Sequence, residues 1–281
     1  MERTKLELHP GLIPVAHQRP GSRRGFLRTI VIALWAAAIW SGPAAAEELV
    51  AVYSAYWAGL PAAEIRLKFH DNSGGYHNEI EISTQGLAQL ITRFRATASA
   101  EGSVAVGRSA EPSQYVAVYD LRKRRDRRVS MYFAHRLGGA VAERAPDDTS
   151  RKPPLAEAFR KNAVDPLTAL ERVREALRSR KPGVFTIPVY DGARRFDIIG
   201  RILDDKTTDD VVRAELMLRP KAGFKGETSE DGDPDDAPRK VEVTATNDAR
   251  AVPLSITVPV FFMPLVIEFK RLCAAPDPCS G

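Results

Sequence analysis

Alternation of apolar and polar residues, sustained from residue 49 nearly to the C-terminal end, is the feature that most limits how this chain can fold. Successive side chains of an extended backbone point to opposite faces, so this period predicts β-strands with one buried and one solvated face. Ile65, Leu67 and Phe69, for example, would share one face of a strand. About eleven strands are expected, at residues 49–59, 63–69, 76–84, 94–104, 114–121, 128–133, 184–190, 193–203, 210–218, 240–246 and 252–269.

One long helix interrupts the strands. Asp165 is a good N-cap, and Pro166 suits the first helical position because its missing N–H would have no partner there. Leu167, Leu170, Val173 and Leu177 then form an apolar stripe, and a polar face opposes it: Glu171, Arg172, Arg174, Glu175 and Arg178. A helical turn at 87–92 and a loop at 138–154 are also expected.

These elements predict a mainly β fold. An antiparallel sheet of so many strands twists, and must curl, split into a sandwich or close on itself. We therefore expect a curved sheet or partly open barrel or sandwich, with the helix packed on or inside it. Asp191-Gly192 predicts a tight type I′ hairpin, which needs positive φ at both central residues.

Residues 1–46 have the three parts of an export signal: a polar segment with several arginines, an apolar run at 30–40, and the small-residue site Ala44-Ala45-Ala46. The apolar run is about half of the roughly twenty residues that a membrane-spanning helix needs, so an anchor is the weaker interpretation. Cleavage is expected after Ala46, which would release the protein into the periplasm.

The segment 22–28 resembles a twin-arginine signal through Arg23, Arg24, Phe26 and Leu27, with Arg28 in place of the usual lysine. The precursor would then use the twin-arginine export machinery. An ordinary secretory signal with paired arginines is the alternative, and only the route would differ.

Removal of this leader would leave a chain with almost no net charge. The chain has 41 Lys and Arg against 36 Asp and Glu, but the leader holds six of the former and two of the latter, which leaves 35 against 34. A nucleic-acid partner is not expected, because it requires a strongly positive surface. The predicted organisation is a leader at 1–46, a single β-rich domain at 47–272 and a short tail at 273–281.

Cys273 and Cys279 are the two cysteines of the chain. In an oxidising compartment such a pair predicts a disulfide, here one that would fix the tail. A metal site at these cysteines is the weaker alternative, because no histidine lies nearby in the sequence.

His70 and His77 flank the turn at 71–75 and could meet across a hairpin, where with Asp71 they would form a metal or acid–base cluster. The competing interpretation is that both are solvated turn residues. His135 is the third histidine after the leader. The sequence has no nucleophile elbow, zinc-protease helix or phosphate-binding glycine loop, so neither catalytic residues nor a cofactor are predicted.

A run of basic residues at 122–128 is the sharpest charge feature, and could contact anionic lipid headgroups or an acidic partner protein. Its bases are Arg122, Lys123, Arg124, Arg125, Arg127 and Arg128. The simpler interpretation is a strand end kept soluble by charge.

An acidic segment at 227–236 has Asp231, Asp233 and Asp235 at alternating positions, with Glu242 where a calcium loop places its last ligand. Pro234 interrupts this loop and Asp236 replaces the required glycine, which favours a solvated connection over a calcium site.

Several short motifs together resemble the bacterial exported family called domain of unknown function 3108. They are residues 53–60 with Trp57-Ala58-Gly59-Leu60, 83–87, Pro112 with Tyr115, 165–167, 191–194 and 218–220. Ala62 and Ala63 depart from this pattern, in which a second glycine is expected. The resemblance implies an envelope protein built of a curved antiparallel sheet, and supplies no catalytic residues.

We therefore expect a periplasmic, non-enzymatic protein that holds an apolar or amphiphilic envelope ligand against the concave face of its sheet, or docks to an envelope partner. One alternative is an envelope hydrolase that uses His70 or His77 on cell-wall or lipid substrates. A second alternative is a structural module of an envelope assembly.

Overall fold

The structure, a computed structural model, describes residues 47–72, 74–91, 93–105, 107–121, 124–150, 153–203, 210–224, 237–260 and 263–274. The predicted leader lies outside these residues, including Arg23, Arg24, Phe26, Leu27 and the cleavage site after Ala46. The described residues belong to one compact unit, which begins at Ala46. Among the described helices, none has the length and apolarity needed to cross a membrane.

Thirteen antiparallel strands form one sheet in the described chain. The strands are β1 (Glu47–Trp57), β2 (Leu60–Asn72), β3 (Gly75–Thr84), β4 (Phe94–Ser103), β5 (Glu111–Leu121), β6 (Arg124–Arg136), β7 (Gly139–Arg144), β8 (Val184–Tyr190), β9 (Arg195–Leu203), β10 (Val211–Ala222), β11 (Arg239–Thr246), β12 (Pro253–Val260) and β13 (Met263–Ala274). The described helices are α2 (Ala88–Ile91), α3 (Glu157–Arg160) and α4 (Pro166–Ser179).

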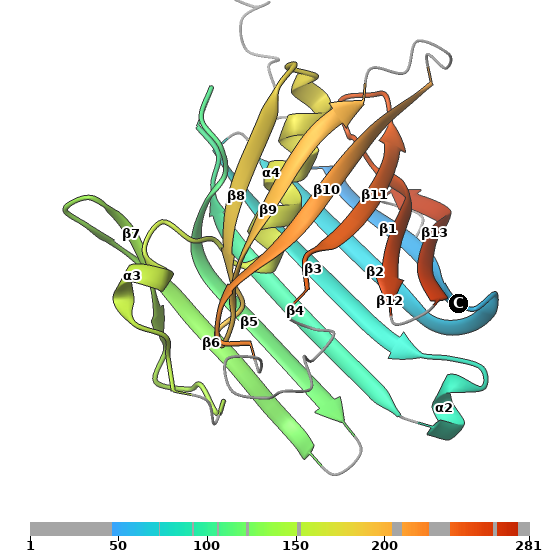
Figure 1. Cartoon of the computed structure of the whole chain (residues 1–281), viewed down its shortest axis with the longest axis horizontal. Coiled ribbons are helices and arrows are strands. Elements are labelled where there is room, and N and C mark those ends of the chain that lie inside the picture. The colour runs from blue at the N-terminus through green and yellow to red at the C-terminus, as the bar shows by residue number, and fades with distance from the viewer. Residues whose placement is uncertain are drawn as a thin grey trace, which may run out of the picture. The chain divides into compact units, whose positions relative to one another are not determined.

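The two halves of the sheet meet in the middle of the strand order. Strands β1 to β7 follow one another to one edge, while β8 to β13 return from the other edge until β13 pairs with β1. The two edge strands, β7 and β8, are thus neighbours in the sequence and are joined through α3 and α4 (Figure 1).

One short segment between α3 and α4 covers both sheet edges. Lys161 forms an antiparallel bridge with Val141 of β7, and Val164 forms a parallel bridge with Val189 of β8. The amide of Tyr190 donates to the carbonyl oxygen of Val164 at 2.8 Å. Backbone groups that an open edge would expose are paired here, so the sheet is nearly closed.

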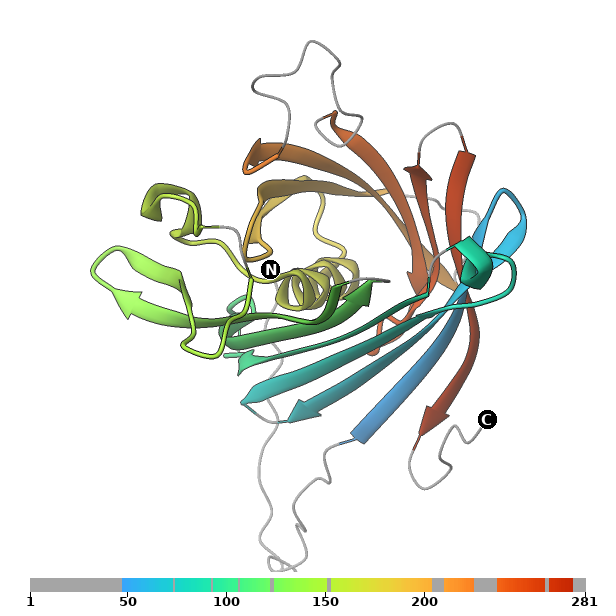
Figure 2. The same ribbon diagram turned by 90° about the horizontal axis from the view of Figure 1, so that it is seen from below.

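Helix α4 lies inside the curved sheet (Figure 2). The carboxylate of Asp165 caps it by accepting from the amides of Leu167 and Thr168, both at 2.9 Å. The helix ends at Ser179. The amide of the C-cap residue Arg180 still donates to the carbonyl of Ala176 at 3.1 Å, and the left-handed backbone of Arg180 (φ 46°) then directs the chain out of the helix.

The core surrounds α4 on three sides. Val173 and Leu177 pack in a cluster with β8 to β11, Leu167 packs in a second cluster with β3 to β7, and Leu170 contacts a third built on β1, β2 and β13. Complete burial of one such aliphatic side chain contributes about 1.5 to 3 kcal/mol. The prediction of a mainly β, curved antiparallel sheet with one packed helix is confirmed.

Three details differ from the sequence prediction. Residues 139–144, expected in a loop, form β7, and the stretch at 252–269 is two strands rather than one. The β8–β9 turn is longer than the predicted type I′ turn: Tyr190 pairs with Arg195, and only Gly192 of the expected pair has positive φ. The carboxylate of Asp191 organises this turn by accepting from the amides of Ala193 and Arg194.

Candidate functional site

A buried polar chain fastens the start of α4 to the sheet. Asp165 is fully buried, and besides its two backbone donors it accepts from the hydroxyl of Thr168. The Thr168 oxygen in turn lies 2.5 Å from the phenol oxygen of Tyr76 on β3. Burial raises the pKa of Asp165 to about 6, although the hydrogen bonds act in the opposite direction.

A buried ion cluster continues this polar line in the middle of α4. Glu171 and Arg174 are 2% and 1% exposed, and Arg174 Nη1 lies 2.5 Å from Glu171 Oε2. Arg178 pairs with the other Glu171 oxygen, and Asn78 Nδ2 of β3 donates to Glu171 at 3.4 Å. Arg174 Nη2 also donates to the carbonyl of Arg250 at 2.7 Å. These contacts tie the helix to both halves of the sheet.

Phe69 and Asp71, both on β2, complete the surroundings of Arg174. The guanidinium lies over the Phe69 ring, 3.8 Å from its centroid, and 3.8 Å from Asp71 Oδ2. Burial raises the pKa of Asp71, and the nearby charge of Glu171 adds to this effect. The Asp71 side chain is still 49% exposed, so it lies where this polar cluster meets the solvent.

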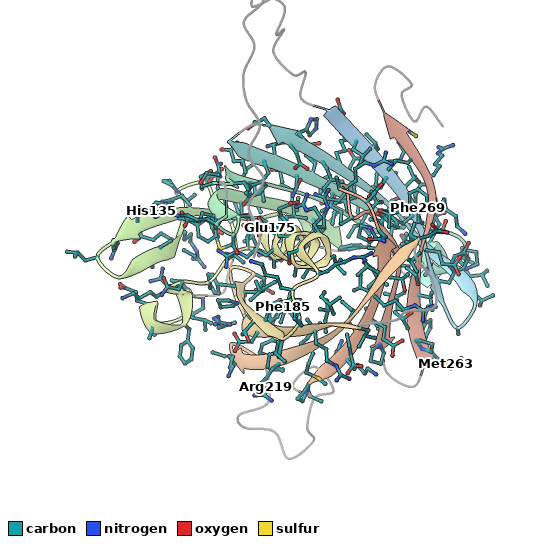
Figure 3. The ribbon with its side chains drawn as sticks, turned by 90° about the horizontal axis from the view of Figure 1, so that it is seen from above. His135, Glu175, Phe185, Arg219, Met263 and Phe269 are labelled. Atoms are coloured by element: carbon teal, nitrogen blue, oxygen red, sulfur yellow. The ribbon has the colours of Figure 1, made fainter. Side chains whose placement is uncertain are left out.

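A pocket of about 780 Å³ opens beside this cluster at one end of the barrel. The β2–β3 turn, the β4–β5 loop, the second half of α4 and the start of β8 form its walls. Glu175 of α4 and Phe185 of β8 line it together (Figure 3). Its charged lining residues are Asp71, Arg108, Glu171, Arg172, Glu175, Arg178 and Lys181, and its larger apolar ones are Val104, Val184, Phe185 and Ile187.

Two of these charges are fixed by one backbone unit of the β4–β5 loop. The amide of Ala110 donates to Glu175 Oε1 at 2.9 Å, and Arg172 Nε donates to the Ala110 carbonyl at 2.8 Å. Burial raises the pKa of Glu175 and lowers that of Arg172. By contrast, Arg108 and Lys181 are exposed and form no ion pair with any described residue.

His70 and His77 do come together, as the hairpin predicts, on the outer face of the sheet. They are register partners on β2 and β3, with ring centroids 5.8 Å apart. Their neighbours are Glu79, 3.1 Å from His77 Nε2, and Glu48, 3.9 Å from His70 Nε2. Asp71 points to the opposite face and is not part of this pair. In the described chain no group of three or more His, Cys, Asp or Glu could hold a metal ion.

The basic run lies at the other end of the sheet, where β6 begins at Arg124 opposite Leu121 of β5. Arg122, Lys123 and the side chains of Arg124 and Arg125 lie outside what the structure describes. Arg128 forms an ion pair with Asp147 at 2.8 Å. The role of Arg122 to Arg128 as a binding surface stays a prediction.

The remaining candidates fall partly outside the described residues. Asp231, Asp233 and Asp235 are among them, and Glu242 is engaged on β11, 3.2 Å from Lys240 Nζ. Cys273 lies in β13, which extends into the expected tail, while Cys279 is not described. The disulfide thus stays a prediction. His135 is exposed on β6.

Sequence reasoning missed the interior position of Glu171 and Arg174, which it placed on the polar face of the helix, opposite the apolar stripe. A signal was nevertheless present in β3, where Asn78 occupies an inward position between Tyr76 and Ile80. A polar residue at a buried strand position requires a hydrogen-bonding partner, and α4 supplies it.

The model of a family described as "Protein of unknown function (DUF3108)" matches residues 52–269, so the chain belongs to this family. No curated protein matches the chain. A solved beta-barrel-like protein of the domain of unknown function DUF1849 from Brucella abortus is similar, with a TM-score of 0.52 and 9% identity, over 82% of this chain and 98% of that one. This similarity concerns the fold alone.

Proposed function

We propose that this member of the DUF3108 family is a periplasmic binding protein for an anionic amphiphile, held in the pocket beside the second half of α4. The observation that carries the proposal is one cavity of about 780 Å³ with both an apolar wall and four cationic side chains. Its volume is within the range of about 300 to 1,000 Å³ that is typical of small-molecule sites.

The apolar wall would hold the chain of the ligand. Val184 stands 70% exposed at the start of β8, although it is a large apolar residue, and Phe185 and Ile187 follow it along the strand. Ile187 is already buried, so an alkyl chain laid here would remove mainly Val184 and Phe185 from water, which favours binding by about 25 cal/mol per Å² of apolar surface.

The cationic side chains would hold the head group. Arg172 and Arg178 are positioned by contacts to Ala110 and Glu171, whereas Arg108 and Lys181 stand at the surface of the pocket. A phosphate or carboxylate can accept charge-assisted hydrogen bonds from several such donors at once. Two of the three acidic lining residues already have partners: Glu171 pairs with Arg174 and Arg178, and Glu175 accepts from the amide of Ala110.

The proposed ligand lies at one end of the barrel, not on the concave face of the sheet, where the sequence suggested it. The concave face packs against α4, and the side chains of three core clusters fill the space around the helix. A ligand would therefore replace solvent beside α4, not occupy the interior of the sheet.

The two alternatives have less structural support. His70 and His77 face outward and lie among carboxylates, and no serine, threonine or cysteine is among their described contacts, so a hydrolase would lack a nucleophile there. A purely structural module would not need a charged pocket beside an apolar wall. Neither alternative explains the exposure of Val184.

The test measures binding of a fluorescent lysophospholipid with a phosphoglycerol head group. Arg108→Gln combined with Lys181→Gln should weaken binding about tenfold, because two charge-assisted contacts are lost. Val184→Gln should weaken it as well, and a phosphocholine analogue without net charge should bind less tightly than the anionic probe.

The matched control is Arg201→Gln combined with Lys221→Gln, which removes the same two charges from the outer face of the sheet, where they pair with Glu215 and Asp197. It should leave binding unchanged. The proposal is wrong if the probe does not bind saturably, or if the two double variants bind it equally well.

A further inference from the structure

Large apolar side chains gather at the end of the barrel that lies opposite the pocket. Nine large apolar residues of the described chain are exposed, and five of them lie here: Trp57, Leu60, Leu87, Leu90 and Met263. Leu90 and Leu87 are 79% and 61% exposed. We call these five residues the apolar tip. So many exposed apolar side chains in one place mark an interaction surface more often than chance exposure does.

Strand register explains why three of the five residues come together. Trp57 at the end of β1 pairs with Leu60 of β2 on one side and with Leu265 of β13 on the other. Met263 begins β13 two positions before Leu265, at the tip of the β12–β13 hairpin (Figure 3). Two neighbouring hairpins therefore present apolar residues at the same end.

The connection between β3 and β4 adds the two leucines. The amide of Gln85 donates to the carbonyl of Ala62 at 2.9 Å, which holds this connection against the start of β2. Gly86, with φ of +59°, lies so close to Pro61 that a Cβ would meet the Pro61 carbonyl oxygen at 2.9 Å. Leu87 lies just before α2 and Leu90 lies within it. The helix is beside the β1–β2 hairpin (Figure 2).

Basic residues lie beside the apolar tip, at the ends of β4 to β6. Arg93 and Arg95 follow α2 and are both exposed. Strand β5 ends and strand β6 begins at the same end of the sheet. Phe94 of β4 pairs with Leu121 of β5, and Leu121 pairs with Arg124 of β6. The described beginning of the basic run is thus at the same end as the apolar tip.

We propose that this end of the barrel docks onto the surface of an anionic lipid bilayer, with the apolar tip inserted between head groups and the neighbouring arginines on the lipid phosphates. Aromatic and aliphatic side chains flanked by bases are the combination that membrane interfaces bind. The charge complements anionic lipid, and the apolar residues project from hairpin tips. This inference does not depend on the proposed ligand.

The orientation that results keeps the pocket accessible. Strand β2 runs from Leu60 in the apolar tip to Asn72 in the pocket lining, so the two features lie at opposite ends of one strand. In a docked molecule the pocket would face the aqueous compartment. Variants of the apolar tip should therefore bind the soluble lysophospholipid probe as well as the unchanged protein does.

Residues 46–281 are the protein to test, because this compact unit contains every strand of the sheet and lacks the apolar run at 30–40. Trp57 is its only tryptophan, since the other two of the chain are Trp35 and Trp40. On vesicles of phosphatidylglycerol and phosphatidylethanolamine, Trp57 emission should shift to the blue and be quenched by brominated lipid chains. On phosphatidylcholine vesicles both changes should be much smaller.

Leu87→Ser combined with Leu90→Ser should reduce partitioning onto the anionic vesicles by about tenfold or more, because two exposed aliphatic side chains no longer leave water. Arg93→Gln combined with Arg95→Gln should reduce it by about fivefold per charge. Leu137→Ser combined with Phe159→Ser is the matched control, since these two exposed apolar residues lie outside both the apolar tip and the pocket lining. It should partition as the unchanged protein does.

Several outcomes would overturn the inference. They are an unchanged Trp57 emission in the presence of anionic vesicles, equal partitioning onto neutral vesicles, and equal losses in the leucine pair and its control. A dimer that the leucine variant abolishes, without vesicle binding, would instead assign the apolar tip to a second copy of the chain. Far-ultraviolet circular dichroism of each variant checks that the sheet is retained.

Discussion

Replacement of Arg174 by alanine should destabilise the protein by about 3 to 5 kcal/mol, the cost typical of removing one partner from a buried ion pair. Arg174 is 1% exposed, and its guanidinium contacts Glu171, the carbonyl of Arg250 and the ring of Phe69. Without it, the Glu171 carboxylate would remain buried with one fewer cation. Urea unfolding, followed by circular dichroism, measures the change in the free energy of unfolding.

Two comparisons separate this effect from a loss of packing. Arg178→Ala removes the other cation on Glu171, but its side chain is 28% exposed, so water can replace it and the cost should be only about 1 kcal/mol. Glu171→Leu combined with Arg174→Leu removes both buried charges and should be less destabilising than Arg174→Ala alone. A double variant that is at least as unstable as the single one would show that packing, not charge, dominates.

The helix that carries this ion pair could be predicted from the sequence, but the burial of the ion pair could not. Asp165, Pro166 and the leucine stripe correctly predicted α4, because capping and amphipathicity are local properties. The position of Glu171 and Arg174 opposite this stripe gives no local sign of burial, because an amphipathic helix usually packs on one side. A sheet that curls around the helix encloses the polar face as well, and this closure depends on pairing between β1 and β13, far apart in the sequence.

The pocket could not be predicted for a similar reason. Its lining comes from the β2–β3 turn, the β4–β5 loop and the α4–β8 region, and no two of these are adjacent in the chain. Contact between His70 and His77, by contrast, was predictable because one short hairpin joins them. The apolar tip also combines residues from distant hairpins, and its leucines resemble ordinary strand-end residues until the register is known.

Titration of Asp165 should make the protein less stable as the pH rises from about 4 to above 6. This carboxyl group is fully buried, and its pKa is raised from 3.8 in the unfolded chain to about 6 in the folded protein. Between these values the folded state holds a proton that the unfolded state has released. The contribution of Asp165 is therefore fully present below pH 4 and is lost as the pH passes 6, and a shift of about two units corresponds to about 3 kcal/mol.

Asp165→Asn is the variant that reveals this contribution. Asparagine is also a good N-cap and can accept from the amides of Leu167 and Thr168, but it does not titrate in this range. The difference in unfolding free energy between the two proteins, measured by urea denaturation at several pH values, cancels the other titrating groups that both proteins share. The unchanged protein should lose about 3 kcal/mol relative to Asp165→Asn over this interval.

A difference that does not vary with pH would mean that Asp165 remains ionised in the folded protein. The two amides at 2.9 Å and the Thr168 hydroxyl would then offset the whole cost of burying the charge. Thr168→Val distinguishes the two cases, because it removes the hydroxyl that joins Asp165 to Tyr76. If burial dominates, loss of this donor should raise the pKa of Asp165 further and move the loss of stability to higher pH.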